Sequence, residues 1–329
     1  MAPHTPKGTE EANEQLVAYL ADAHSVEEQA LVQMRAAPRV AGDERLAAAF
    51  EEHLRETEGH ERAVRERLAA HGADPSRLKD AAGRAGGWGM VLFARSQPDT
   101  PGKLAAHAYS YEHLEEATYE LLRRAAEHVG DAQTVTAAQE IGAEEKRMEE
   151  RLAGLFDAAV DASLRDLGPE DLGAQLNAYL ADAHAIEKQA ARLLESAAEM
   201  VEDEGLAATL RAHLAETREH ERRVAERLDA RGAGPSALKD AALRLGALDI
   251  GGFFGAQPDT TAKLSGFAYA FEHLEIAAYE LLKRIAERAG DAQTASVAES
   301  ILAEERAAAR AIAESWDRTM RLDMPSDTP

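Results

Sequence analysis

The chain has 329 residues, of which 60 are acidic and 37 are basic, so its formal net charge is −23. This charge repels phosphate backbones and anionic lipid headgroups, which argues against nucleic-acid binding and against binding to a membrane surface. The absence of cysteine excludes disulfides, thiolate zinc sites and cysteine nucleophiles, so a bound metal must take oxygen and imidazole ligands. No apolar run approaches the ~18 residues of a membrane span, and the N-terminal residues do not resemble a signal peptide. We therefore expect a cytoplasmic protein.

Turn signals divide the first half of the chain into helices. Asp74-Pro75 and Thr100-Pro101 each place an N-capping residue before a proline, and Asp131 is a further N-cap candidate. No stretch alternates between apolar and polar residues as a strand would. The order of these helices predicts an all-α fold. In this half of the chain, two helical hairpins are joined by a crossover of about thirty residues that contains an extra helix. The expected helices cover approximately residues 14–36, 43–71, 75–95, 100–129 and 131–158.

The second half of the chain repeats the first. Tyr19-Leu-Ala-Asp-Ala-His24 recurs as Tyr179-Leu-Ala-Asp-Ala-His184, and Glu112-His-Leu-Glu115 recurs as Glu272-His-Leu-Glu275, in both cases 160 residues later. Each copy is large enough to be a domain with its own core, unlike the short units of a solenoid. We therefore expect two tandem domains, at residues 11–160 and 171–320, packed as an intramolecular pseudo-dimer.

Each long helix has a core-facing stripe that is apolar at both ends and carries or adjoins glutamate at its middle. On the second helix the stripe contains His53, Thr57 and His60, and Glu56 adjoins it. An ionised glutamate in a helical core costs several kcal/mol unless a cation neutralises it, and no lysine or arginine lies on these stripes. Two divalent cations per domain would resolve the conflict, since carboxylate and imidazole suit iron or manganese. The candidate ligands are Glu27, Glu56, His60, Glu112, Glu115 and Glu145 in the first copy, and Glu187, Glu216, His220, Glu272, Glu275 and Glu305 in the second.

The two copies act as an internal comparison. All six candidate ligands are the same in both copies, whereas four nearby acidic residues differ. These are Glu28, Glu58, Glu116 and Glu149, which are replaced by Lys188, Arg218, Ile276 and Ala309.

Four segments of each copy resemble the YciE/YciF family of ferritin-like proteins. In the first copy they are Tyr19-Leu-Ala-Asp22 with Glu27, His53-Leu-Arg-Glu56-Thr57 with His60, Glu112-His-Leu-Glu115, and Glu144-Glu145. The resemblance covers nearly the whole of each copy, and the Glu-x-x-Glu motif is also similar to rubrerythrin. It implies two tandem ferritin-like four-helix bundles, each with a long crossover, a dinuclear metal centre and a link to stress response.

The usual di-iron pattern places a histidine three residues after a glutamate on two helices. Here Met148 stands three residues after Glu145, so one expected histidine ligand is missing from each copy. His24 and His184 are candidate replacements, because they precede Glu27 and Glu187 by one helical turn. We expect three further residues to hydrogen-bond to the ligands rather than to act as ligands: His53, His213 and Glu144.

The leading hypothesis is a di-iron (or di-manganese) carboxylate protein, a ferroxidase-type oxidoreductase that oxidises Fe²⁺ with O₂ or peroxide under stress. The alternative is a non-enzymatic helical scaffold or stress-associated binding protein without a functional metal centre. A catalase-like dimanganese enzyme would differ from the first hypothesis only in its metal and oxidant. A metal-dependent rise in melting temperature would favour the metal-binding hypotheses over the scaffold.

Overall fold

The computed structural model describes residues 7–75, 80, 100–168, 170–201, 203–234 and 260–324, and these residues contain helices and no strand. The prediction of an all-α chain is confirmed for this part. The extra helix expected at about residues 75–95 lies outside the described residues, apart from Pro75 and Asp80. The helices of the first copy are α1 (Lys7–Ala36), the short 3-10 helix η1 (Ala37–Arg39), α2 (Glu44–Ala70), α4 (Thr100–Val129), α5 (Ala132–Ala153) and α6 (Phe156–Leu164). Those of the second copy are α7 (Leu172–Met200), α8 (Glu204–Ala230), α10 (Thr260–Arg288) and α11 (Ala292–Asp323).

Local sequence sets where these helices begin and end. The side chain of Asp43 accepts hydrogen bonds from the backbone N–H groups of Arg45 and Leu46, which otherwise lack partners at the start of α2. Asp131 caps α5 in the same way. Gly130, with a φ of 76°, adopts the left-handed conformation that ends α4.

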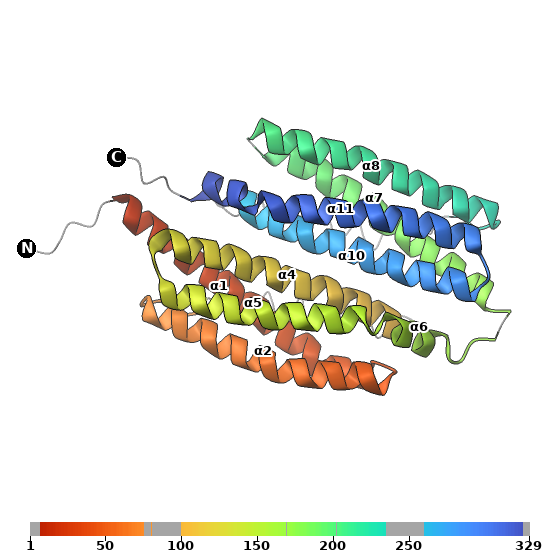
Figure 1. The fold of residues 1–329 in the computed structure, drawn as a ribbon, viewed down its shortest axis with the longest axis horizontal. Helices are drawn as coiled ribbons and strands as arrows, with labels where there is room; N and C mark the ends of the chain where they lie inside the picture. The colour runs from red at the N-terminus through yellow and green to blue at the C-terminus, as the bar shows by residue number, and fades with distance from the viewer. Residues whose placement is uncertain are drawn as a thin grey trace, which may run out of the picture.

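Within each copy the long helices pack side by side. In the first copy, α1 contacts α2 and α4, and α5 contacts α4 and α2. The second copy repeats this order, since α7 contacts α8 and α10, and α11 contacts α10 and α8. The two sets lie next to each other, with α4 of the first copy against α10 of the second (Figure 1).

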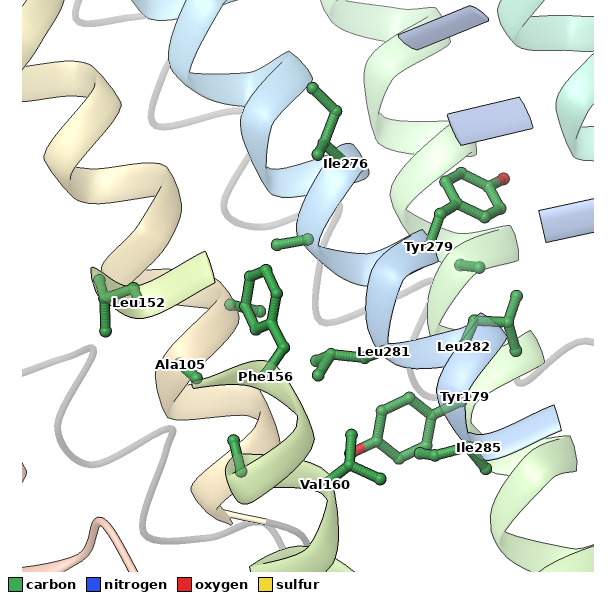
Figure 2. Packing of buried hydrophobic residues seen from close by; sticks show 14 of the residues in the cluster. Ala105, Leu152, Phe156, Val160, Tyr179, Ile276, Tyr279, Leu281, Leu282 and Ile285 are labelled. Carbon is green, nitrogen blue, oxygen red and sulfur yellow. The ribbon is translucent and has the colours of Figure 1, made fainter. Parts of the chain in front are cut away.

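The two copies form one intramolecular pair with a shared apolar core. Phe156 and Val160 of α6 pack with Leu281 and Ile285 of α10 in a single buried cluster (Figure 2).

The two copies also exchange equivalent ion pairs. In one pair the first copy contributes the lysine and the second the aspartate, and in the other pair these roles are reversed. Lys103 pairs with Asp182 at 3.1 Å, and the equivalent Lys263 pairs with Asp22 at 2.5 Å. The expected intramolecular pair is therefore confirmed, and it has pseudo-twofold character.

The last helix of the first copy is interrupted, in contrast to the prediction of one helix over 131–158. Helix α5 ends at Ala153 and α6 begins at Phe156, whereas α11 runs through the equivalent positions without a break. Gly154 stands at the interruption and Glu314 at the corresponding position of α11. Glycine is a poor helix former, so the local sequence favours the break in the first copy only.

None of the helices in the described residues combines the length and the apolar character needed to cross a bilayer.

Candidate metal centre

Six buried side chains converge at mid-length of the first copy. None of them is more than 3% exposed. Their positions on four different helices bring them to one level because each lies on the core-facing stripe of its helix. They are Glu27 from α1, His53 and His60 from α2, Glu112 and Glu115 from α4, and Glu145 from α5.

Glu145 lies between the two histidines. Its Oε1 atom is 2.8 Å from Nδ1 of His60, and its Oε2 atom is 3.2 Å from Nε2 of His53. Two groups of possible ligand atoms result, and within each group the atoms lie no more than 4.8 Å apart. One group is Glu27, His60 and Glu145, and the other is His53, Glu112, Glu115 and Glu145.

The second copy repeats the first of these groups. Nδ1 of His220 is 2.7 Å from Oε1 of Glu305 and 3.8 Å from Oε1 of Glu187. His60 is likewise 3.8 Å from Glu27 in the first copy. Nε2 of His213 lies 2.9 Å from Oε1 of Glu272, and Glu275 is only 1% exposed.

Carboxylates outside the cluster fix the orientation of the imidazole rings. Nε2 of His60 donates to Glu144 at 2.8 Å, and Nδ1 of His53 donates to Glu56 at 3.0 Å. In both cases the other ring nitrogen then faces the buried glutamates. Such carboxylate–imidazole pairs are typical of metal-binding histidines. The prediction that Glu144 is an outer partner agrees with this geometry.

The positions of Glu56 and His53 are the reverse of those expected, since Glu56 was expected among the ligands and His53 outside them. The Glu56 side chain is 30% exposed and lies outside the two ligand groups, whereas His53 is fully buried and points into one of them. The neighbouring Thr57 explains the rotation of α2. Its hydroxyl donates to the His53 carbonyl, so Thr57 is buried without an unpaired group, whereas the Glu56 carboxylate accepts from Nδ1 of His53 and stays partly exposed. Glu216 is similarly outside the cluster in the second copy, with a side chain that is 60% exposed.

The structure does not place His24 with the ligand groups. Its Nδ1 atom lies 3.0 Å from Asp80 and its Nε2 atom 3.1 Å from Glu61. The equivalent His184 approaches Glu221 at 3.5 Å. A substitute histidine is not needed, because His53 and His60 supply one imidazole to each group.

Burial and mutual repulsion strongly shift the pKa values of the buried glutamates. Burial raises the pKa of Glu27 to about 8 and that of Glu112 to about 7. Burial, followed by repulsion from neighbouring glutamates, raises the pKa of Glu115 well above its usual value. Burial also acts to raise the pKa of Glu145, but contacts with His53 and His60 outweigh it and hold the pKa at about 2.

The buried donor atoms fit a cation. Within the described part of the chain, both oxygens of Glu115, Oε1 of Glu112 and Oε2 of Glu27 lack a hydrogen-bond partner. The oxygens of Glu145 and Oε2 of Glu112 contact imidazole nitrogens of His53 and His60. A buried polar atom without a partner costs about 1–3 kcal/mol, and charged atoms cost more. Buried carboxylates and imidazoles that face one another can recover this cost by holding a divalent cation. The buried His and Glu clusters could therefore hold metal ions.

We expect the metal-free chain to lose stability as pH rises from about 5 to 9. The folded-state pKa values of Glu27, Glu112 and Glu115 lie above the reference value of 4.5, and burial opposed by Glu145 leaves that of His60 at about 9, above 6.5. A raised folded-state pKa stabilises the protein fully below the unfolded-state pKa, and this contribution disappears as pH rises through the folded-state value. The melting temperature of protein treated with chelator should fall by on the order of 5 °C across this range.

Divalent metal should oppose this fall, because binding requires the deprotonated side chains and so strengthens with pH. A melting temperature of the metal-free chain that rises steadily from pH 5 to 9 would contradict the assigned burial of these acids.

Comparison with known protein families gives one match that spans most of the chain. The model of the family described as Domain of unknown function (DUF892) matches residues 11–165 and again residues 172–324. The two matches correspond to the two copies identified from the internal repeat.

Proposed function

The chain belongs to the DUF892 family. We propose that each of its two copies contains a di-metal carboxylate centre that oxidises Fe²⁺. The observation that carries the proposal is the position of Glu145, which belongs to both ligand groups and directs one oxygen toward each histidine. A carboxylate shared by two cations roughly 3.5–4 Å apart is a common feature of two-metal sites.

The helix arrangement supports a ferritin-like four-helix bundle in each copy. The four long helices contact one another in a closed order, and α4 begins at Thr100, well after α2 ends at Ala70 in the sequence. Bundles of the ferritin type have one such crossover and carry their metal ligands on inward faces of four helices. The resemblance of the sequence to the YciE/YciF family favours the same fold and a role in stress response.

The ligand roles follow from the two groups. Glu27 and His60 would hold one ion, while His53, Glu112 and Glu115 would hold the other, with Glu145 between them. Fe²⁺ bound at both positions would be the substrate. The two ions would give one electron each and become Fe³⁺, and with two protons these electrons would reduce peroxide to two water molecules or O₂ to peroxide. Manganese suits the same oxygen and nitrogen ligands and is the alternative metal.

The surrounding side chains position the ligands and control protons. The Tyr119 hydroxyl donates a hydrogen bond to Glu27, and Tyr279 donates to Glu187 in the second copy. Because burial keeps the pKa of Glu27 at about 8, this acid loses its proton when a cation binds. The high negative charge of the chain favours the approach of Fe²⁺.

Anaerobic loading with Fe²⁺, followed by mixing with peroxide or O₂ in separate experiments, tests this function. We expect Fe³⁺ absorbance to develop faster than in buffer. Glu145→Gln should remove about half of the protein-dependent rate, and the double variant Glu145→Gln/Glu305→Gln should remove nearly all of it, because each glutamine replaces a shared ligand. Glu140→Gln, at an exposed position of α5, is the matched control.

Equal oxidation rates for the double variant and the Glu140→Gln control would contradict the proposed function. Metal binding without faster oxidation would leave a metal-binding protein and remove the ferroxidase assignment.

A further inference from the structure

Another group of candidate ligands lies in the first copy where it meets the second. His113 and Glu116 of α4 and Glu149 of α5 place possible ligand atoms within 4.8 Å of one another. None of these residues belongs to either of the groups that share Glu145. The His113 ring stacks on His273 of α10, with ring centroids 3.5 Å apart and planes inclined by 17°. The group therefore lies beside the pseudo-twofold contact between α4 and α10.

His113 is oriented as a ligand. It is 4% exposed, and its Nδ1–H donates to the carbonyl of Tyr109 at 2.7 Å. This bond fixes the tautomer, so the lone pair of Nε2 is free to bind. Nε2 points toward Oε2 of Glu149 at 3.5 Å, which is long for a direct hydrogen bond. A histidine that donates one ring N–H to a backbone carbonyl and turns the other nitrogen toward carboxylates is typical of metal sites.

Glu149 provides the second, independent observation. It is 6% exposed, and its Oε1 atom has no hydrogen-bond partner among the residues that the structure describes. Burial and the nearby Glu116 raise the pKa of Glu149 to about 9, so the site favours a positive charge at this carboxyl group. A cation could replace the proton there.

The second copy contributes to the site without duplicating it. The Tyr269 hydroxyl of α10 donates to Oε2 of Glu116 at 2.7 Å and so orients this carboxylate. His273 repeats the arrangement of His113, since its Nδ1 donates to the Tyr269 carbonyl at 2.8 Å. Ile276 and Ala309, however, stand where Glu116 and Glu149 would be. The acids at this position are therefore confined to the first copy.

We propose that His113, Glu116 and Glu149 form a separate site for one divalent first-row metal ion per chain, at the contact between the two copies. One imidazole and two carboxylates suit Zn²⁺, Mn²⁺, Fe²⁺ or Co²⁺. Glu116 is half-buried, so an ion can reach the group from solvent. The site requires both copies, because Tyr269 orients one of the ligands.

The double variant Glu116→Ile/Glu149→Ala tests the proposal, because it introduces the residues that the second copy already carries at these positions. We expect the variant to fold and to bind one equivalent of Co²⁺ fewer per chain than the unmodified protein. Bound Co²⁺ is counted by elemental analysis after equilibrium dialysis, and its visible absorption reports the loss of a site with one histidine. Thermal unfolding verifies the fold.

An unchanged Co²⁺ count in the folded variant would overturn the proposal. If the variant does not fold, the single variant Glu149→Gln replaces it in the same measurement with the same two outcomes. The Glu145→Gln/Glu305→Gln variant distinguishes this site from the proposed di-metal centres. This variant should lose the Co²⁺ ions of those centres and retain the one Co²⁺ per chain whose binding depends on Glu149.

Discussion

Addition of Mn²⁺ to the metal-free chain is expected to raise its melting temperature by roughly 10 °C or more. A ligand present at a hundred-fold excess over its Kd stabilises the folded state by about 2.7 kcal/mol per site. One kcal/mol corresponds to about 2–4 °C for domains of ~150–250 residues. The proposed function places two ions in each copy, so the contributions of several ions add.

Two controls determine whether this rise comes from the buried glutamates. K⁺ at equal ionic strength should leave the melting temperature nearly unchanged. The Glu145→Gln/Glu305→Gln chain should show a much smaller rise with Mn²⁺, because both shared carboxylates are lost. No rise with either Mn²⁺ or anaerobic Fe²⁺ would favour the alternative function, a helical scaffold without a metal centre.

Replacement of Glu115 by methionine should have opposite effects on the metal-free and the metal-loaded chain. Glu115 is fully buried, and neither of its oxygens has a hydrogen-bond partner in the described part of the chain. Exchanging buried charge for an apolar side chain of similar volume is often neutral or stabilises a protein by about 1–4 kcal/mol. We expect Glu115→Met to stabilise the metal-free chain at pH 8 by an amount in this range, and to reduce the stabilisation by Mn²⁺.

Glu275→Met should reproduce both effects in the second copy, and Glu51→Met, at an exposed position of α2, should reproduce neither. Denaturant unfolding with and without Mn²⁺ measures the free energies. If Glu115→Met destabilises the metal-free chain while leaving the effect of Mn²⁺ intact, Glu115 is a structural acid and not a ligand.

Periodicity and repetition were sufficient to predict the helices and the pairing of the two copies. The spacing of apolar residues predicted the buried faces of the long helices, apart from the exact orientation of α2, since a helix that packs on its neighbours must carry such a stripe. Glu27, Glu112 and Glu145 lie where these stripes predict. The break at Gly154 was not predicted, because one exposed glycine is compatible with a continuous helix.

The orientation of α2 was the main feature that the sequence left open. His53 and His60 lie seven residues apart, so both face the core, and Glu56 and Thr57 flank this line on opposite sides. Periodicity alone cannot decide which flank is buried. The decision depends on tertiary packing, which buries the hydroxyl that can bond to its own helix and exposes the carboxylate. The absence of a histidine after Glu145 was misleading for the same reason, since α2 supplies both imidazoles.

The group at the contact between the copies was missed because its acids differ between the copies. Glu116 and Glu149 are replaced by Ile276 and Ala309, a difference that by itself looks like ordinary divergence. Only the three-dimensional position of His113, with its Nε2 turned toward Glu149, shows that these acids lie together. The signal available in the sequence was that two acidic residues differ between the copies, one on each of two helices that pack on each other.

Anomalous diffraction from crystals grown with Mn²⁺, recorded together with elemental analysis, tests the central claim most directly. The proposed function assigns two cations to each copy, so we predict a pair of peaks on either side of Glu145 and a second pair on either side of Glu305. No anomalous peak at these glutamates, together with an elemental analysis that finds no bound metal, would contradict the proposed centres and leave only the helical architecture.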